Sequence, residues 1–134
     1  MWHKCATQTG CIFCCFGFQN RKQISKYYAI ADLLVLPSSR ETWGIVVNEA
    51  MCFRLPVIVS DQVGAGMDLV IDGHNGYRVP TTGDALFRSI KQIADLSEAE
   101  RLLMGMRSFD IVKAWSNRNL AELLIDHIAL IKTR

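Results

Sequence analysis

Hydrophobic and polar positions follow a strand–helix–strand order between residues 31 and 60. The short, continuously apolar run at residues 33–36 predicts a strand buried on both faces. Pro37 ends this run, because proline has no N–H to give to a neighbouring strand. Apolar positions at helical spacing predict a helix from near Gly44, and residues 56–60 predict a second buried strand. Such a unit implies parallel strands.

Similar patterns flank this unit. Residues 12–16 predict a strand, residues 22–31 a helix, residues 67–71 a short helical turn and residues 77–79 a last short strand. The helix predicted at 84–96 carries one apolar face, made of Leu86, Ile90, Ile93 and Ala94. We therefore expect an α/β fold, with a Rossmann-like parallel sheet between flanking helices and a helical C-terminus.

The last part of the chain reads as two further helices. Ser97 and Glu100 match a capping box at the start of the first. Its predicted buried stripe consists of Leu102, Leu103, Met106, Phe109 and Val112. Ser116 is a suitable N-cap for the second helix. Its stripe consists of Leu120, Leu123, Leu124, Ile128 and Ile131, which invites self-association if it is exposed.

Composition narrows the class of protein. The chain has 134 residues, half of them hydrophobic, which is enough for one globular core. A net charge of +2 argues against nucleic acid as a partner. No apolar run approaches the ~20 residues that a membrane-spanning helix needs, and residues 12–18 make a poor signal peptide. We expect a cytoplasmic chain, able to work at the inner face of a membrane.

The first fifteen residues are an atypical, cysteine-rich leader, and the main domain is expected at residues 16–134. Cys11 and Cys14, together with Cys5 and His3, could be drawn as a zinc site. No second C-x-x-C follows, and neighbouring thiols on a strand point to different faces. The sequence favours free thiols, and we expect no metal.

Two carboxylates frame the central loop and helix. Glu41 precedes the predicted helix, and Glu49 lies eight residues after Glu41, within that helix. The helix N-terminus offers backbone N–H groups and a partial positive charge, which suit an anion such as a diphosphate. Carboxylates beside such a site accept hydrogen bonds from hydroxyl groups. Diphosphate and diols together describe a nucleotide-sugar.

These residues stand in the segment P-S-x-x-E-T-W-G-I-V-V-N-E-A-M, followed by L-P-V-I-V-S-D-x-V-G. Residues 16–116 resemble the donor-binding half of retaining glycosyltransferases of the GT-B fold, family 4. The resemblance implies the latter part of a GT-B C-terminal domain. With 134 residues, the chain is expected to lack the acceptor domain of that family, and no match to the family's diphosphate-binding Arg and Lys stands upstream of Phe16.

The resemblance also implies roles for single residues. Glu41 would bind hydroxyls of the transferred sugar and is the candidate catalytic residue, while Glu49 would bind the ribose diol. Three backbone amides would meet the diphosphate and sugar, those of Trp43, Gly44 and Ile45. The family needs no metal or other cofactor, and the nucleotide-sugar is its substrate.

A second loop faces the same crevice if the sheet is parallel, because loops at the carboxyl ends of neighbouring strands lie together. Its candidate residues are Ser60, Asp61 and Gly64, and the alternative is a plain glycine-rich connection.

Several residues have a structural reading beside the functional one. Tyr27 and Tyr28 could stack on a base, but packing of their helix is the favoured interpretation. Trp43 could line the site or belong to the core. His74 fits a solvated turn. Arg54 stands where the family has glycine in a left-handed helix end, so it predicts a strained position.

The main hypothesis is a retaining glycosyltransferase that carries the donor half-site and acts on a glycan or lipid-linked acceptor. The alternative is an inactive fragment, or a nucleotide-sugar-binding subunit that needs a separate acceptor domain or subunit. A sugar-phosphate epimerase is a weaker rival, because no histidine is placed for that reaction.

Overall fold

The computed structural model describes residues 3–6, 12–15 and 21–115, with side chains from residue 23 onward. The chain divides into two compact units, Met1–Ile30 and Ala31–Arg134. In the first, strands β1 (His3–Ala6) and β2 (Ile12–Cys15) pair antiparallel, and helix α1 (Arg21–Ile30) follows. The strand predicted at 12–16 and the helix predicted at 22–31 are confirmed. β1 was not predicted, because its four residues mix polar and apolar types without a strand pattern.

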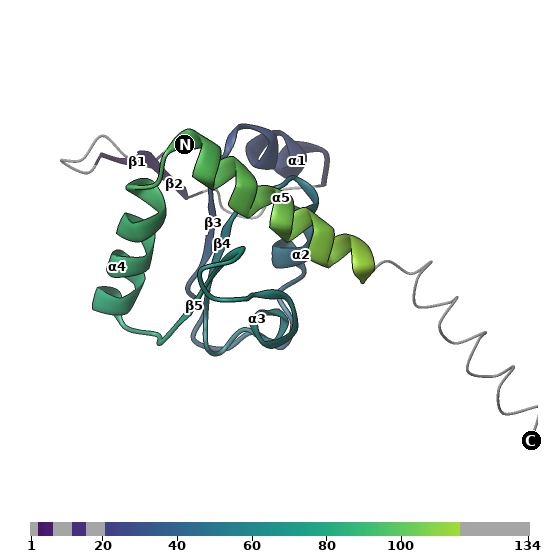
Figure 1. Cartoon of the computed structure of the whole chain (residues 1–134). Coiled ribbons are helices and arrows are strands. Elements are labelled where there is room, and N and C mark those ends of the chain that lie inside the picture. The colour runs from purple at the N-terminus through teal and green to yellow at the C-terminus, as the bar shows by residue number, and fades with distance from the viewer. Residues whose placement is uncertain (1–2, 7–11, 16–20, 116–134) are drawn as a thin grey trace, which may run out of the picture. The chain divides into compact units, whose positions relative to one another are not determined.

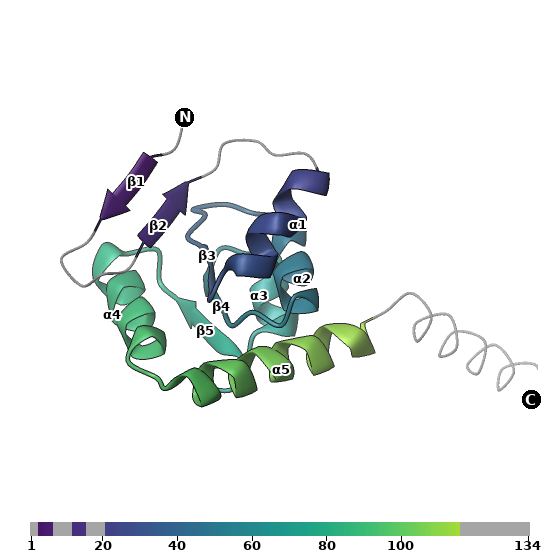
Figure 2. The same cartoon turned by 90° about the horizontal axis from the view of Figure 1, so that it is seen from above.

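The second unit contains a parallel sheet of three strands in the order β3–β4–β5 (Figures 1 and 2). These are β3 (Leu34–Leu36), β4 (Val57–Ser60) and β5 (Gly76–Val79). Helices α2 (Ile45–Cys52) and α3 (Gly64–Leu69) cover one face of the sheet, and α4 (Gly83–Ala94) covers the other. The predicted α/β fold with a parallel sheet is confirmed.

Burial differs between the two strands that were predicted to be buried on both faces. All four residues of β4 are buried, because this strand lies between β3 and β5. The residues of β3 are only half-buried, since β3 is an edge strand of the described sheet. Double-sided burial was therefore right for β4 and wrong for β3.

The segment after β4 also differs from its prediction. A short helical turn was expected at 67–71, after a glycine-rich loop, but α3 begins at Gly64 and ends at Leu69. The helix starts earlier because its small residues pack closely. Ala65 and Gly66 are buried, and a Cβ on Gly66 would lie 2.7 Å from Val59 Cγ2.

Helix α5 (Glu98–Ala114) begins with the predicted capping box: the Ser97 side chain accepts from the Glu100 amide, and the Glu100 carboxylate accepts from the Ser97 amide. Its predicted buried stripe is largely wrong. Leu102, Leu103 and Met106 are exposed (61%, 48% and 55%), while Phe109 is half-buried and Val112 is buried. The buried face consists of Met104, Gly105, Ser108 and Val112.

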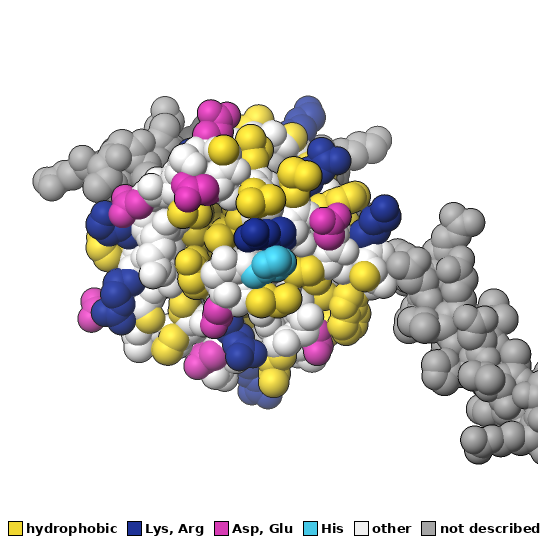
Figure 3. All heavy atoms as spheres, viewed as in Figure 1, with side chains coloured by type: hydrophobic (Ala, Val, Ile, Leu, Met, Phe, Trp, Pro, Cys, Tyr) yellow, Lys and Arg dark blue, Asp and Glu magenta, His cyan; other side chains and the backbone are white. Residues whose placement is uncertain are grey.

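Close packing of the backbone explains why small residues occupy the buried face of α5. A Cβ on Gly105 would lie 1.9 Å from the Arg54 carbonyl oxygen, so only glycine fits there. Ser108 Oγ donates to the Asn75 carbonyl at 3.3 Å. The larger apolar side chains consequently point outward, and yellow atoms stand among charged ones over the face that α5 crosses (Figure 3).

The core on the α4 side of the sheet follows the predicted helical pattern in part. Ile93 is buried there with Ile58 and Val79, and Leu86 and Ile90 pack against this cluster. Ala94 was placed on the same face but is exposed, because it lies at the last turn of the helix. The final predicted helix, from Ser116 onward, and the self-association assigned to it lie outside the described residues.

Candidate functional site

The segment between β3 and α2 is joined by hydrogen bonds to the turn that follows β4. The Glu41 amide donates to the Gln62 carbonyl at 3.1 Å, and the Gly64 amide donates to the Glu41 carbonyl at 3.1 Å. The Ala65 amide donates to the Trp43 carbonyl at 2.8 Å. The main chains of Glu41 and Val63 thus form a parallel bridge beyond the strand ends. The prediction that these two loops are adjacent is confirmed.

Two glycines make this close approach possible. A Cβ on Gly64 would lie 2.1 Å from the Thr42 carbonyl oxygen, which no side chain could tolerate. Gly44 has a left-handed backbone, with φ of 88°, and is buried directly before α2. Both residues therefore have a structural reason to be glycine, apart from any ligand.

The two candidate carboxylates come from the same short segment. Glu41 is held by its backbone in the loop before α2, and Glu49 lies in the second turn of that helix; both side chains are half-buried. Gly44 gives α2 no side-chain cap, and its carbonyl accepts from the Val47 amide at 2.8 Å. The first amides of a helix have no partner within it, and they carry its positive dipole end. Ile45, the first residue of α2, is exposed.

Trp43 packs against two other elements. Its indole Nε1 donates to Asn48 Oδ1 at 2.8 Å, and its ring centroid lies 6.0 Å from that of Trp115, at the end of α5. Trp43 is half-buried, so it is neither a full core residue nor a fully open site wall. The contacts of Trp43 with Asn48 and Trp115 were not predicted. Asn48 lies five residues away and Trp115 far along the chain, and neither separation indicates a contact.

The candidate residues of the second loop have partners within the protein. Ser60 is buried, its Oγ donates to the Ser38 carbonyl, and it accepts from the Gln62 amide. Asp61 is exposed and accepts from Thr81 Oγ1 at 3.1 Å. These contacts connect the ends of β3, β4 and β5.

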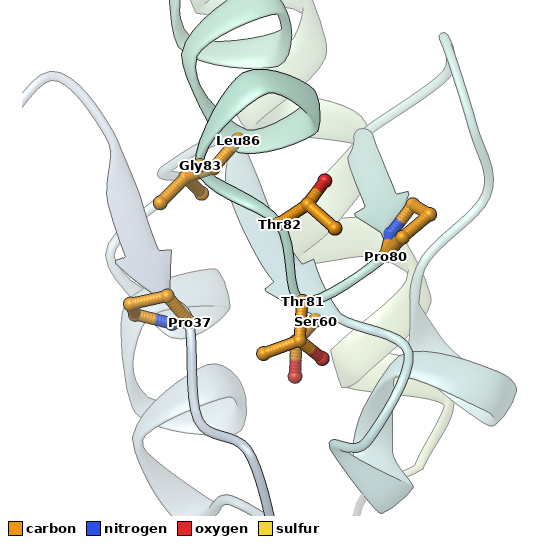
Figure 4. A pocket seen from close by; sticks show the side chains of 7 residues that line it. All are labelled: Pro37, Ser60, Pro80, Thr81, Thr82, Gly83 and Leu86. Atoms are coloured by element: carbon orange, nitrogen blue, oxygen red, sulfur yellow. The ribbon is translucent and has the colours of Figure 1, made fainter.

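A small pocket of about 170 Å³ opens at the same edge of the sheet (Figure 4). Pro37, Ser60 and Pro80 stand near the carboxyl ends of the three strands, and the N-terminus of α4 closes the pocket. The remaining lining residues are Thr81, Thr82, Gly83 and Leu86. Residues 80–83 were not predicted to line the site, although their place directly after the last strand is a usable signal.

The other candidate residues have mainly structural surroundings. His74 is exposed in a turn, as expected, and Tyr28 is buried while Tyr27 is half-buried.

Within residues 23–115, no group of histidine, cysteine or acidic side chains could hold a metal ion. The cysteine side chains of the candidate zinc site lie outside the described residues. None of the described helices has both the length and the apolar character to cross a bilayer.

Known proteins resemble this chain in sequence and in fold. The sequence model of the family "Glycosyl transferases group 1" matches residues 6–104. An uncharacterized glycosyltransferase of Methanocaldococcus jannaschii is 31% identical over 107 residues, which cover 79% of this chain and 27% of that protein. A lipopolysaccharide 1,2-N-acetylglucosaminetransferase of Salmonella typhimurium is 30% identical over 81% of this chain and 29% of its own length.

Solved structures agree. Sucrose-phosphate synthase from Thermosynechococcus elongatus matches with a TM-score of 0.70 and 30% identity, over 89% of this chain and 30% of that one. TarM matches with a TM-score of 0.65 at 20% identity, over 81% of this chain and 22% of that one, which supports the fold alone. The chain thus spans between a quarter and a third of the first three of these proteins.

Proposed function

Because this chain belongs to the glycosyl transferases group 1 family, with GT-B enzymes as its structural neighbours, we propose that it carries the donor half-site of a retaining glycosyltransferase. The donor is a nucleotide-sugar, and the acceptor is a glycan or a lipid-linked sugar. Turnover requires an acceptor-binding half as well, supplied by the same polypeptide or by a separate subunit. The work takes place in the cytoplasm, at or near a membrane surface.

One observation carries the proposal: backbone hydrogen bonds fix Glu41 beside the start of α2, the helix that also carries Glu49. One glutamate therefore stands just before the N-terminus of α2 and the other in its second turn, at the carboxyl edge of a parallel sheet, where such folds bind their ligands. The helix end suits a diphosphate, and the carboxylates suit the hydroxyl groups on either side of it.

Each residue then has a role in the transfer. Glu49 accepts hydrogen bonds from the ribose diol, and Glu41 accepts them from hydroxyls of the transferred sugar. The amides around Gly44 stabilise the negative charge that grows on the leaving diphosphate. An acceptor hydroxyl attacks the anomeric carbon from the face that the diphosphate leaves, and the leaving phosphate takes the hydroxyl proton, so the anomeric configuration is retained. The reaction needs no metal, because the helix end and the amides take over charge stabilisation.

Calorimetric titration of the full chain with uridine, guanosine and adenosine diphosphates, and with their sugar conjugates, tests this proposal. We expect saturable binding of one base. Glu49→Ala should weaken it roughly 10- to 100-fold, since hydrogen bonds to a charged group contribute about 1.5–3 kcal/mol. The melting temperature should stay nearly unchanged, because the proposed role of Glu49 is to bind the ribose and not to hold the fold.

Asp68→Ala is the matched control, because Asp68 is an exposed carboxylate on α3. It should leave both affinity and melting temperature unchanged. A folded chain that binds none of these nucleotides at millimolar concentration would refute the proposed donor site. A large fall in melting temperature with Glu49→Ala would instead make Glu49 a structural residue.

A further inference from the structure

Helix α5 is attached to α2 near both ends of that helix. Beyond the C-terminal end of α2, the Arg54 carbonyl lies against Gly105, and the Arg54 guanidinium lies 5.3 Å from the centre of the Phe109 ring. Before the N-terminal end, Trp43 meets Trp115. The two helices therefore run antiparallel, and Trp115, the residue that follows α5, contacts the loop between β3 and α2.

Trp115 contacts Trp43 although half of its own surface is exposed. It is 52% exposed, so its ring is not buried in the core. Its ring and that of Trp43 are tilted by 44° at 6.0 Å, a geometry in the normal range for attractive aromatic pairs. The Trp43 indole Nε1 also donates to Asn48 Oδ1, and the Trp43 carbonyl accepts from the Ala65 amide. Trp43 thus joins α2, α3 and the end of α5.

Backbone hydrogen bonds hold Glu41 and Trp43, and the Trp115 ring adds a side-chain contact to the same loop. Gly44 gives α2 no side-chain cap, and the left-handed backbone at this position is one of several that glycine can adopt. A loop that is free to sample them would lose conformational entropy on binding a ligand, and this loss lowers affinity. A ring packed on Trp43 restricts the loop before the ligand arrives.

We propose that Trp115 is a positioning residue, which holds residues 41–44 in their binding conformation through its contact with Trp43. The inference rests on the proposed function, because these residues form the donor loop. It assigns a role to the C-terminal end of α5, a helix that otherwise contributes only packing and lies far along the chain from both carboxylates.

Hydrogen exchange of single amides tests the contact without any ligand. The amides of Gly64 and Ala65 donate to the carbonyls of Glu41 and Trp43, so they report on opening of the loop. In Trp115→Ala they should exchange roughly two- to tenfold faster, as loss of an aromatic pair predicts. The amide of Val57, which donates to the Asn75 carbonyl, serves as the core reference in each variant.

Phe109→Ala is the matched control, because it removes an aromatic ring from the other attachment of α5 to α2. It lowers overall stability but should not accelerate Gly64 and Ala65 relative to Val57. Trp115→Phe keeps an aromatic ring and should restore most of the protection. Unchanged relative exchange in Trp115→Ala, or equal acceleration in Phe109→Ala, would overturn the inference.

Affinity for uridine, guanosine and adenosine diphosphates gives the second measurement. We expect Trp115→Ala to weaken the binding seen with wild type by roughly two- to tenfold, and Phe109→Ala to leave it unchanged under conditions where both are folded. Faster exchange with unchanged affinity would also overturn the positioning role. If wild type binds no nucleoside diphosphate, the donor site fails, while the exchange rates still decide whether Trp115 holds the loop.

Discussion

The two ends of helix α2 share a backbone conformation but not a residue type. Gly44 precedes the helix with φ of 88°, and Arg54 follows it with φ of 58°. Within the described residues, Arg54 is the only non-glycine with a positive φ. Left-handed backbone costs a non-glycine residue about 1–2 kcal/mol. Arg54 therefore carries a strain that Gly44 does not.

Surrounding space explains the difference. A Cβ on Gly44 would lie 3.0 Å from Val63 Cγ1 and 3.1 Å from Leu36 Cδ2. Arg54, in contrast, is exposed, and its guanidinium finds the Phe109 ring. At the end beside the candidate site, both the left-handed conformation and the lack of space favour glycine. At the far end only the conformation favours glycine, and arginine is tolerated there.

Arg54 still completes a regular helix end. Its amide donates to the Met51 carbonyl at 3.0 Å, and the Leu55 amide donates to the Ala50 carbonyl at 3.2 Å. This is the Schellman pattern, which normally carries glycine at the left-handed position. The predicted left-handed conformation of Arg54 is confirmed, and Arg54 satisfies the carbonyls of α2 without being glycine.

The largest effect is expected from Gly44→Ala. The added methyl group must adopt the left-handed conformation and also push against Val63 and Leu36, so we expect a loss of about 2–3 kcal/mol in the free energy of unfolding. Urea denaturation measures this loss. Nucleotide affinity should fall as well, because the start of α2 has to move.

Gly73→Ala separates the two causes. Gly73 also has a positive φ, 71°, but nothing lies within 4 Å of the position that its Cβ would take. It should therefore cost only about 1 kcal/mol, from conformation alone. Equal losses at Gly44 and Gly73 would mean that crowding beside the candidate site is unimportant, and the comparison of the helix ends would lose its basis.

A smaller effect of opposite sign is expected from Arg54→Gly. Relief of the left-handed strain should exceed the loss of the contact with Phe109 and the extra flexibility of glycine in the unfolded chain, for a net gain of about 0.5 kcal/mol. Thermal unfolding should show a slightly higher melting temperature. Arg54→Ala keeps the strain and loses the contact, so it should lower stability; a gain there would show that the arginine itself is unfavourable.

The same contrast shows what could be predicted from the sequence. The β3–α2–β4 unit follows from local signals, an apolar run and a proline, whereas the left-handed conformation of Arg54 was expected from the family resemblance, which places glycine there. The capping box of α5 is local too. Adjacency of the two loops followed from a topological rule, since parallel strands bring their carboxyl ends to one edge.

The failures concern packing between distant segments. Leu102, Leu103 and Met106 looked like a buried stripe, yet Gly105 faces α2 because the Arg54 carbonyl leaves no room for a side chain. The sequence around Gly105 contains no signal that predicts its contact with the Arg54 carbonyl. The link from Trp43 to Trp115 escaped notice for the same reason, since it joins residues that are far apart in the chain.

The smallest expected effect concerns a helix end that is capped by side chains. Hydrogen bonds from the Ser97 hydroxyl and amide to the Glu100 carboxylate lower the pKa of Glu100 from its ordinary value of 4.5. A lowered pKa in the folded state stabilises the protein above pH 4.5, and this contribution is lost as the pH falls through the folded-state pKa. Glu100→Gln should therefore melt slightly below wild type at pH 7, and the difference should shrink toward pH 3.

Gly44 and Arg54 cap α2 through backbone groups, so the stability changes in Gly44→Ala and Arg54→Gly should be independent of pH over this range. Melting curves of these two variants and of Glu100→Gln at both pH values test the difference between the two kinds of cap. A constant difference between Glu100→Gln and wild type would mean that the carboxylate's charge contributes nothing to the α5 cap.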